Sequence, residues 1–364
     1  MRSLGIVGVT LIAGSCLGQG FTAVGRIGPS NSSVAMSISS DGTTVVGRTT
    51  TFDRAWRWNA GSGLITLTGA PAGLSLDAAS DVSQDGTTIV GTMNNGVGTF
   101  AYRWTAGAGI QRVVGIGGGG SFGPFVSADG STIVGTHEGS TLSARRWTQA
   151  TGAQPLGPVT GLPFGNGSAL LGYGVSSDGS VIVGPAEAVY QTSPLATTVT
   201  PFRWTAGGGA VGILDNGQFY NPLAGAGASS VSADGSVMVG YSGTTAWRWS
   251  SATGFQPLVT PPPIAGTFVP SISGDGATVA YREFLWTQTG GTQTLTDVLT
   301  SAGCTFTGWT GLRVIDTSFN GRALCGYGTN PTGQTEAWYA TIPAPGAGAL
   351  LAAAASLTTR RRRA

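Results

Sequence analysis

The sequence predicts an all-β fold, a seven-bladed β-propeller with four antiparallel strands in each blade and a ring closed by an N-terminal strand. Three observations predict it: a unit that recurs seven times, four short strand patterns in each unit, and the lack of a sustained helical period. Every unit contains a tight turn, Asp-Gly in six copies and Asn-Gly in the last, with a serine two residues earlier. The turns stand at Asp41, Asp85, Asp129, Asp178, Asp234, Asp275 and Asn320, at intervals of 41 to 56 residues.

The fifth unit shows the four strand patterns most clearly. Its first strand ends at Ser232, and the second strand, after the turn, contains two adjacent apolar residues, Met238 and Val239. Because side chains alternate along a strand, adjacent apolar residues indicate a sheet that is buried on both faces. A third strand ends in Arg-Trp at Trp249, and Gly254 opens a fourth. Four evenly spaced strands in each unit favour a propeller over a sandwich.

The Arg-Trp pair of the third strand recurs in five units. Arginine and tryptophan are adjacent, so they point to opposite faces of the strand. A tryptophan at the same place in successive units predicts packing between blades rather than an array that stacks on sugars.

The N-terminus supplies a strand that the count of patterns lacks. Seven first strands are present but only six fourth strands, and residues 21–27 resemble a fourth strand. Pairing this segment with residues 337–342 would close the ring and cover two sheet edges that otherwise favour aggregation. We therefore expect the propeller to occupy residues 21–342.

Residues 1–20 are predicted to be a signal peptide. Arg2 precedes an apolar stretch at 4–13, and small residues at Cys16 and Gly18 fit a cleavage site. The alternatives are a buried first strand and a lipoprotein signal that ends at Cys16.

Residues 343–364 are predicted to be a sorting tail. They begin with Pro343 and Pro345, continue as an alanine-rich apolar run at 347–357, and end in Arg360, Arg361, Arg362 and Arg363. The run is shorter than the roughly 17–25 residues that span a membrane. A disordered basic tail is the alternative.

Both the tail and the repeat resemble known families. The proline motif, apolar run and arginine cluster resemble the PEP-CTERM sorting signal of bacterial exported proteins, with alanine where that family has glutamate. The pattern Ser-x-Asp-Gly-x-x-x-Val-Gly followed by Arg-Trp resembles the HAF-type extracellular repeats, over residues 34–342. The resemblances imply an exported protein at the cell surface or in the extracellular matrix, with a membrane-embedded sortase as its partner during export. They imply no enzymatic chemistry.

The charge balance excludes one class of partner. Charged residues make up 9% of the chain, against about 25% in a typical globular protein, and all 18 basic residues are arginine. Without Arg2 and the four terminal arginines, 13 arginines remain against 16 acidic residues, a balance of about −3. The arginines of the repeat are spread along the chain without a basic cluster. We therefore expect no nucleic-acid partner.

The residues for metal or cofactor chemistry are few. His137 is the only histidine, which removes a multi-histidine metal site and the usual imidazole base of a serine nucleophile. We expect it, with Glu138, on a solvated loop. One aspartate per unit is more simply a turn residue than a calcium ligand, and the glycine run at 115–120 is expected to link two blades. The sequence thus predicts no catalytic residue, no metal site and no cofactor.

Variation between the units is confined to two of their connections, which share one face of a propeller. The distance from the turn aspartate to the tryptophan of the third strand is 11 residues in the sixth unit and 26 in the fourth. Variable loops on a rigid scaffold are where binding sites usually lie. The longest stretches, residues 185–200 and 215–227, contain the predicted ligand-binding residues Glu187, Tyr190, Asp215, Phe219 and Tyr220.

Cys304 and Cys325 are the cysteines that remain after removal of the signal peptide. An exported protein permits a disulfide between them, which would close a loop of about 20 residues and contribute about 3 kcal/mol to stability. Alternatively, Cys325 is a small core residue, because it stands where other units have valine.

These observations predict a non-catalytic binding or structural module whose ligand is an extracellular carbohydrate or protein. The alternative is a carboxylate-dependent carbohydrate-active enzyme on the same scaffold. That enzyme would need paired acids about 5–9 Å apart on the variable face.

Overall fold

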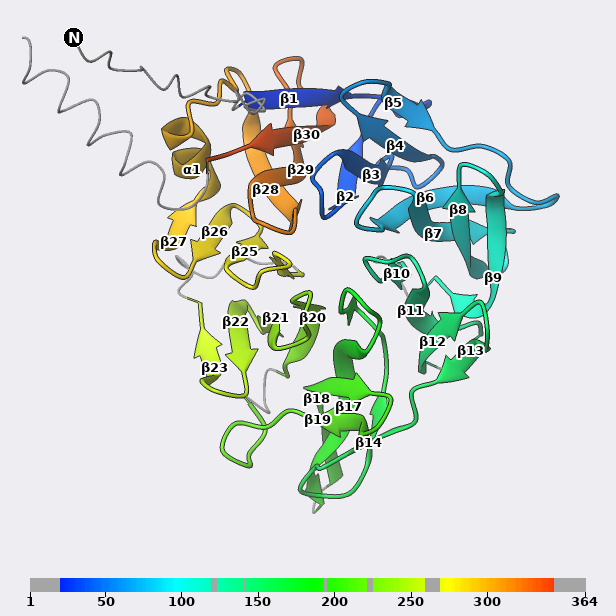
Figure 1. Cartoon of the computed structure of the whole chain (residues 1–364), viewed down its shortest axis with the longest axis vertical. Helices are drawn as coiled ribbons and strands as arrows, with labels where there is room; N and C mark the ends of the chain where they lie inside the picture. Colours follow the sequence, from blue (N-terminus) through cyan, green and yellow to red (C-terminus); the bar gives the residue numbers. More distant parts are fainter. Residues whose placement is uncertain are drawn as a thin grey trace, which may run out of the picture.

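The structure, a computed structural model, describes residues 20–118, 123–139, 142–192, 195–220, 225–258 and 269–343. Its sheets follow one another in chain order around a common centre, in a propeller-like arrangement (Figure 1). The predicted all-β class is confirmed. The predicted signal peptide up to residue 19 and the predicted tail from residue 344, with Pro345 and the arginines at 360–363, lie outside the described residues.

Four sheets contain four antiparallel strands each. The first consists of β2 (Val34–Ile38), β3 (Thr44–Arg48), β4 (Ala55–Asn59) and β5 (Gly63–Thr66). The second consists of β20 (Gly227–Val231), β21 (Val237–Ser242), β22 (Thr245–Ser250) and β23 (Gly254–Pro257). The third consists of β24 (Ser271–Ile272), β25 (Thr278–Tyr281), β26 (Phe284–Thr287) and β27 (Gly291–Thr294). The fourth consists of β28 (Thr310–Thr317), β29 (Ala323–Thr329), β30 (Thr335–Thr341) and β1 (Gly20–Gly25).

An eight-stranded sheet covers the second and third units. Its strands are β6 (Ser75–Val82), β7 (Thr88–Asn94), β8 (Thr99–Thr105), β9 (Gly109–Gly117), β10 (Phe125–Val126), β11 (Thr132–His137), β12 (Ala144–Thr148) and β13 (Gly152–Pro155). The two units share one sheet because β9 continues through residues 115–117 and pairs with β11, where Ile116 lies opposite His137. Two expectations are therefore wrong: this part of the glycine run is a strand rather than a linker, and His137 ends a strand rather than lying on a loop.

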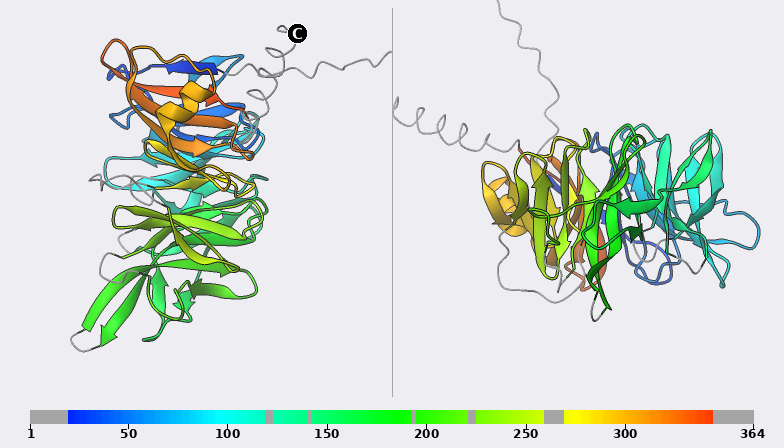
Figure 2. Two further views of the ribbon diagram at one scale, coloured as in Figure 1. Left: turned by 90° about the vertical axis from the view of Figure 1, so that its left-hand side faces the viewer. Right: turned by 90° about the horizontal axis from the view of Figure 1, so that it is seen from below.

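A six-stranded sheet covers the fourth unit. Its strands are β14 (Pro158–Thr160), β15 (Gly167–Ala169), β16 (Gly174–Val175), β17 (Val181–Thr192), β18 (Leu195–Thr205) and β19 (Gly209–Gly212). Most of the predicted variable loop at 185–200 is thus a paired hairpin of β17 and β18, which extends beyond the other sheets (Figure 2). The sequence did not predict β14 and β15, which pair with β19 and β17.

The seven Asp-Gly or Asn-Gly turns are joined by a continuous series of backbone hydrogen bonds. In each case an amide of one turn donates to a carbonyl of the next, at 2.9 to 3.3 Å. The donor and acceptor pairs are Asp41 and Gln84, Gln84 and Ala128, Asp129 and Ser177, Ser177 and Ala233, Ala233 and Gly274, Asp275 and Phe319, and Phe319 and Ser40. The last pair returns from the seventh unit to the first, so the turns form a closed ring.

The serine before each turn has two hydrogen-bonding roles. In the fifth unit the Ser232 hydroxyl donates to Oδ1 of Asp234 at 2.6 Å and accepts from the amide of Val237 at 3.0 Å. All seven units repeat both bonds. The glycine of each turn has a φ of 69° to 75°, which glycine adopts without strain. The repeated aspartate is therefore a turn residue, held by the buried serine.

Substitution of this serine is expected to destabilise the fold. Ser232→Ala leaves the amide of Val237 without its acceptor in a site that is 1% exposed, so we expect a loss of about 1–3 kcal/mol in the free energy of unfolding. Ser236→Ala is the matched control, because the exposed Ser236 hydroxyl donates to the same carboxylate. Its effect should stay within about 0.5 kcal/mol. Urea unfolding measures both, and equal losses would contradict the prediction.

The predicted N-terminal closing strand is confirmed. β1 pairs antiparallel with β30, from Gly20 opposite Thr341 to Gly25 opposite Ala337. On one face the ring of Phe21 lies 5.6 Å from that of Trp338. On the other face Val24 is 4% exposed. The two ends of the described chain are therefore fastened together in one sheet.

One short helix, α1 (Leu295–Ser301), follows β27 and was not predicted. The hydroxyl of Thr294 caps its first turn by accepting from the amide of Asp297 at 3.1 Å. Leu295 and Leu299 are buried against the sheet that contains β28. The helix thus covers the face of the last sheet that lies away from the first unit.

Five units pair a glycine of the second strand with a fully buried aromatic residue of the third. The pairs are Gly47 and Trp56, Gly91 and Tyr102, Gly184 and Phe202, Gly240 and Trp247, and Gly326 and Trp338. At Gly240 an added Cβ would lie 2.0 Å from the carbonyl oxygen of Gly227 and 2.3 Å from the Trp247 ring. Only glycine therefore fits under the aromatic ring.

The Arg-Trp pairs make contacts between successive units, as the sequence predicted. The Arg57 guanidinium lies over the Trp104 ring of the next unit, 5.1 Å from its centroid. The same contact recurs between Arg146 and Trp204 and between Arg248 and Trp286. These tryptophans are only partly buried, whereas the aromatic residue two positions before them is buried where it occurs in the same strand.

Cys304 and Cys325 do not form the disulfide that an exported protein would permit. Both thiols are free and buried. Cys304 packs with Leu324 and α1 on one face of the last sheet, whereas Cys325 belongs to the cluster on the opposite face, with Trp58 of the first unit. Adjacent residues of a strand point to opposite faces, so Cys325 points away from Cys304. The structure therefore agrees with the alternative interpretation, in which Cys325 is a small core residue.

Candidate functional site

A cavity of about 570 Å³ lies along the axis of the ring. Its wall includes residues from the first strand of every unit, namely β2, β6, β10, β16, β20, β24 and β28. Turn residues such as Ser40 and Phe319 line one end. Arg48 and Tyr327, at the far ends of second strands, line the other. We call this space the central cavity.

One position in each unit faces the central cavity, two residues before the repeated serine. Its occupants are Ser37, Asp81, Phe125, Gly174, Ser230, Ser271 and Asp316. The serine and turn that follow are nearly constant, but this position varies in charge, size and polarity. A constant scaffold with one variable residue per unit is the organisation expected of a binding cavity.

Asp316 of β28 accepts four hydrogen bonds. Its Oδ1 accepts from the hydroxyl of Ser271 at 2.5 Å and the amide of Thr317 at 2.8 Å. Its Oδ2 accepts from the hydroxyl of Ser37 at 2.9 Å and the amide of Ile38 at 3.0 Å. These donors belong to the sixth, seventh and first units, so the carboxylate joins the two ends of the repeat. Burial raises its pKa, and the hydrogen bonds oppose that effect.

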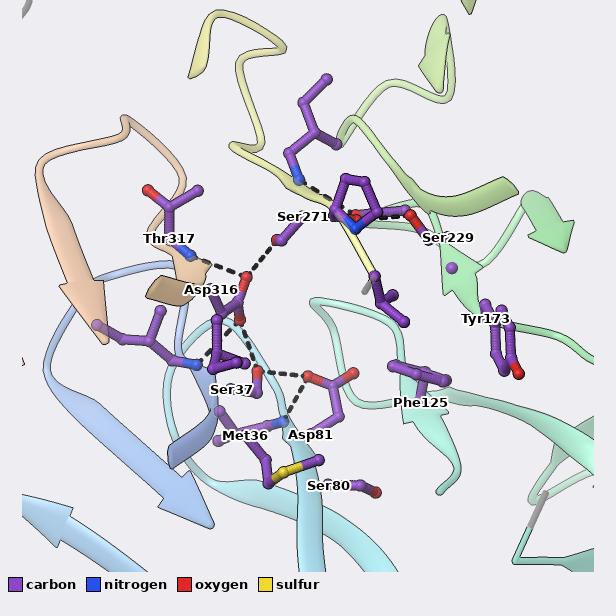
Figure 3. Close-up of a pocket in the computed structure, with 18 of the residues that line it drawn as sticks. Met36, Ser37, Ser80, Asp81, Phe125, Tyr173, Ser229, Ser271, Asp316 and Thr317 are labelled. Atoms are coloured by element: carbon purple, nitrogen blue, oxygen red, sulfur yellow. Dashed lines mark hydrogen bonds between the residues drawn. The ribbon is translucent and has the colours of Figure 1, made fainter. Parts of the chain in front are cut away.

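Asp81 of β6 is the second carboxyl group of the cavity wall (Figure 3). Its Oδ1 accepts from the hydroxyl of Ser37 at 2.7 Å and the amide of Val82 at 2.8 Å. Its Oδ2 accepts from the amide of Val126 in the third unit at 2.8 Å. Because a carboxylate can accept about four hydrogen bonds, Oδ2 keeps one free position.

The two carboxyl groups share one hydroxyl, that of Ser37. A serine hydroxyl has a single hydrogen, so it can donate fully to only one of them. The second carboxyl group makes a full hydrogen bond with Ser37 only when it is protonated, because its own O–H then donates to the serine oxygen. Burial raises the pKa of Asp81 to about 7; its hydrogen bonds from Val126 and Ser37 oppose this effect, and the Asp316 charge adds to it. Geometry and pKa therefore both favour one proton held between Asp81 and Asp316.

This pair predicts that stability falls between about pH 4.5 and pH 8. The pKa of Asp81 is about 7 in the folded chain and near 4 when unfolded, so the folded state binds more protons between those values and stability is lost as the pH rises. The raised pKa values of Asp316 and Asp77 act in the same direction. Below about pH 4 stability is also lost, because turn aspartates with lowered pKa, such as Asp178, become protonated.

Urea unfolding at about pH 4.5 and pH 8 measures the predicted loss. Asp81→Asn removes the titrating group, so the difference in unfolding free energy between the two pH values should shrink in this variant. An unchanged difference would show that another group is responsible.

Two aromatic rings line the central cavity beyond the two acids. In the close-up, Phe125 lies next to Asp81, and Tyr173 lies farther away, on the side opposite Asp316 (Figure 3). The two rings are 6.0 Å apart at an angle of 71°. The cavity wall therefore offers hydrogen-bond acceptors and, next to them, apolar ring surface.

None of the five predicted ligand-binding residues lines the central cavity. Glu187 is exposed on β17, and Tyr190 lies near the end of the same strand. Asp215 closes a tight turn with Gln218. The Tyr220 ring stacks on Phe255 at 4.3 Å, and Phe219 precedes it. The structure brings Asp215 close to Tyr220, whose pKa is raised by burial and then by that charge.

Sequence reasoning missed Asp81 and Asp316, although the chain carries a signal for them. Each is an acid two residues before the repeated serine, at a position where the other five units have serine, glycine or phenylalanine. A charged residue at such a position is uncommon unless it is paired or functional. Alignment of the seven units at the serine would have placed both acids at the same position.

A second hollow, of about 910 Å³, lies between the second and third units. Asp77, Asn94 and His137 are among its lining residues. In the described part of the chain, no three His, Cys, Asp or Glu side chains are grouped so as to hold a metal ion. Nor is any helix in these residues both long and apolar enough to cross a membrane.

The chain matches no known protein-family model and no curated protein. Solved structures of similar shape include TolB from Acinetobacter baumannii, with a TM-score of 0.44 and 12% identity over 87% of this chain and 65% of that chain. A TolB from Agrobacterium tumefaciens has a TM-score of 0.40 and 14% identity over 77% of this chain and 94% of its own. The tricorn protease has a TM-score of 0.49 and 10% identity over 85% of this chain and 34% of its own.

Proposed function

We propose that this chain is an exported, non-catalytic binding module at the cell surface or in the extracellular matrix, with its ligand in the central cavity. The observation that supports the proposal most is the one variable residue that each unit contributes to the cavity wall. Hydrogen-bond acceptors and aromatic rings in the same cavity wall suit a ligand with both hydroxyl groups and apolar faces, such as a carbohydrate.

The scaffold in this proposal is a propeller of seven blades. The closed series of hydrogen bonds between the seven turns supports that number. The eight-stranded sheet is then two blades joined by the extension of β9, and the six-stranded sheet is one blade with β14 and β15 added.

Export is proposed on the two terminal segments of the sequence. The resemblance to HAF-type repeats and to a PEP-CTERM tail supports a membrane-embedded sortase as the partner that recognises residues 343–364. The test is to replace the arginines at 360–363 with neutral residues and to follow the chain through the membrane, envelope and medium fractions. Processing and location identical to those of the parent would contradict the sorting role.

A carboxylate-dependent carbohydrate-active enzyme is the second candidate. Its support is that Asp81 and Asp316 both bind the hydroxyl of Ser37, so their oxygens lie within two hydrogen-bond lengths, close to the spacing of retaining glycosidases. Against it, the four hydrogen bonds of Asp316 leave no lone pair for attack on a substrate. Release of reducing sugar from a glycan panel, abolished by Asp81→Asn, would establish the enzyme.

A glycan array probed with the exported protein tests binding. Ser230→Trp places a large ring in the central cavity and should abolish the signal, whereas Glu187→Gln, on the exposed hairpin, should leave it unchanged. Circular dichroism confirms that both variants fold. If Ser230→Trp folds and binds as the parent does, the ligand does not occupy the central cavity.

A further inference from the structure

Three arginines line the same end of the central cavity, the end away from the repeated turns. Arg48 comes from the first unit, Arg313 from the seventh and Arg282 from the sixth. Arg313 lies opposite Tyr327 in the ladder of β28 and β29, and Tyr327 lines the cavity together with Arg48. The carbonyl of Arg282 accepts from the amide of Val314 at 2.7 Å. These contacts place the three residues together.

This cationic end has little opposing charge. Among the described residues, Arg282 pairs with Glu283, Nε to Oε2 at 3.5 Å, but no carboxylate pairs with Arg48 or Arg313. Arg48 donates one Nη1 bond to the carbonyl of Thr49 and stacks over Phe52, while its buried Nε has no partner. Burial lowers the pKa of Arg48, which is the sign of a charge without sufficient compensation. An anion at this end would supply it.

The other groups of the cavity define the rest of the ligand. Arg313 and Asp316 are three residues apart on β28, which corresponds to about 10 Å along a strand. The free acceptor position on Asp81 and the hydroxyl groups beside it suit a hydroxyl-bearing ligand, and Phe125 with Tyr173 suits the apolar face of a sugar ring. A ligand that reaches both ends is longer than a single sugar ring.

We propose that the central cavity binds an acidic oligosaccharide of at least two sugar rings, with its carboxylate or sulfate at Arg48 and Arg313 and neutral hydroxyl groups at Asp81. This inference rests on the proposed function and adds the charge and length of the ligand. Guanidinium groups match carboxylate and sulfate oxygens with paired hydrogen bonds.

The test is isothermal titration calorimetry of the full chain with digalacturonic acid, its neutral dimethyl ester and a sulfated disaccharide. We expect the acid or the sulfated sugar to bind at least about tenfold more tightly than the neutral ester. Arg313→Gln should remove this advantage without weakening binding of the ester. The control is Arg322→Gln, an exposed arginine of the same unit that does not line the cavity, and it should behave as the parent.

Each outcome has a separate meaning. If the neutral ester binds as tightly as the acid and Arg313→Gln has no effect, the arginines do not recognise an anionic group. That result would leave the proposed binding function intact. If acetate or free sulfate binds at the same arginines as tightly as the acidic disaccharide does, the sugar rings contribute nothing, and the proposed oligosaccharide ligand is wrong. No binding of any of these probes, together with a silent glycan array, would overturn the proposed function as well. Arg313→Lys, which keeps the charge, should retain most of the preference for the acid.

Discussion

Deletion of residues 20–27 is expected to unfold the protein or cause it to aggregate. The deletion removes β1, which packs Phe21 against Trp338 on one face of the last sheet and buries Val24 on the other. Full burial of such a side chain contributes about 1.5–3 kcal/mol, and since Val24 is buried but Phe21 only partly so, the two together account for about 2–5 kcal/mol. Natural domains are stable by only about 5–15 kcal/mol. The deletion also leaves β30 as an open edge, which promotes association between chains.

Thermal unfolding and size-exclusion chromatography measure this effect. A chain that lacks only residues 2–19 is the control, and it should unfold at the temperature of the full chain because β1 remains. A synthetic peptide of residues 20–27 should restore stability to the deletion variant by pairing with β30. If the deletion variant melts at the same temperature as the full chain, β1 is dispensable, and the conclusion that it stabilises the ring by pairing with β30 is wrong.

The architecture could be predicted because its determinants are local and repeated. The serine and the Asp-Gly turn bond each other within a few residues, so the same short pattern specifies the same turn wherever it occurs. The need for a closing strand followed from counting strand patterns, since an open sheet edge is a general liability. Both conclusions hold in the structure without any knowledge of long-range contacts.

The departures from prediction depend on contacts between distant segments. β9 continues past its expected end because the third unit has Arg145 where most units have a buried aromatic residue, and Ile116 occupies that place over Gly135. β17 and β18 extend because they can pair with each other and, in part, with β15. The sequence of one unit contains neither fact.

The candidate site was missed for a related reason. The acids at 81 and 316 are 235 residues apart in the chain and become neighbours only when the ring closes. Their proximity depends on Ser37, which a sequence reader has no reason to distinguish from other serines of the repeat. The predicted binding residues instead lie on the longest connections, mainly in the fourth unit. There the additional residues form an extended hairpin.

Replacement of one of two tryptophans in the same strand tests which of them holds the blades together. The recurrence of Arg-Trp drew attention to Trp249, but the structure buries Trp247 completely and Trp249 only in part. Trp247 covers Gly240, and its ring meets Phe255 edge-on at 5.0 Å. We expect Trp247→Ala to reduce the free energy of unfolding by about 3–5 kcal/mol.

Trp249→Ala should cost less, about 1–2 kcal/mol, because water already reaches part of the ring. Both substitutions remove the same atoms from β22, so differences in strand propensity and in the unfolded state cancel in the comparison. Urea unfolding of the two variants at one pH gives the two losses directly. An equal loss at both positions would mean that the packing of Trp249 on the neighbouring unit matters as much as the glycine-aromatic pair. A larger loss at Trp249 would restore the interpretation that the repeated Arg-Trp pattern suggested. The structure predicts the larger loss at Trp247. Removal of its ring from the close-packed backbone at Gly240 leaves a cavity that the neighbouring strands cannot fill.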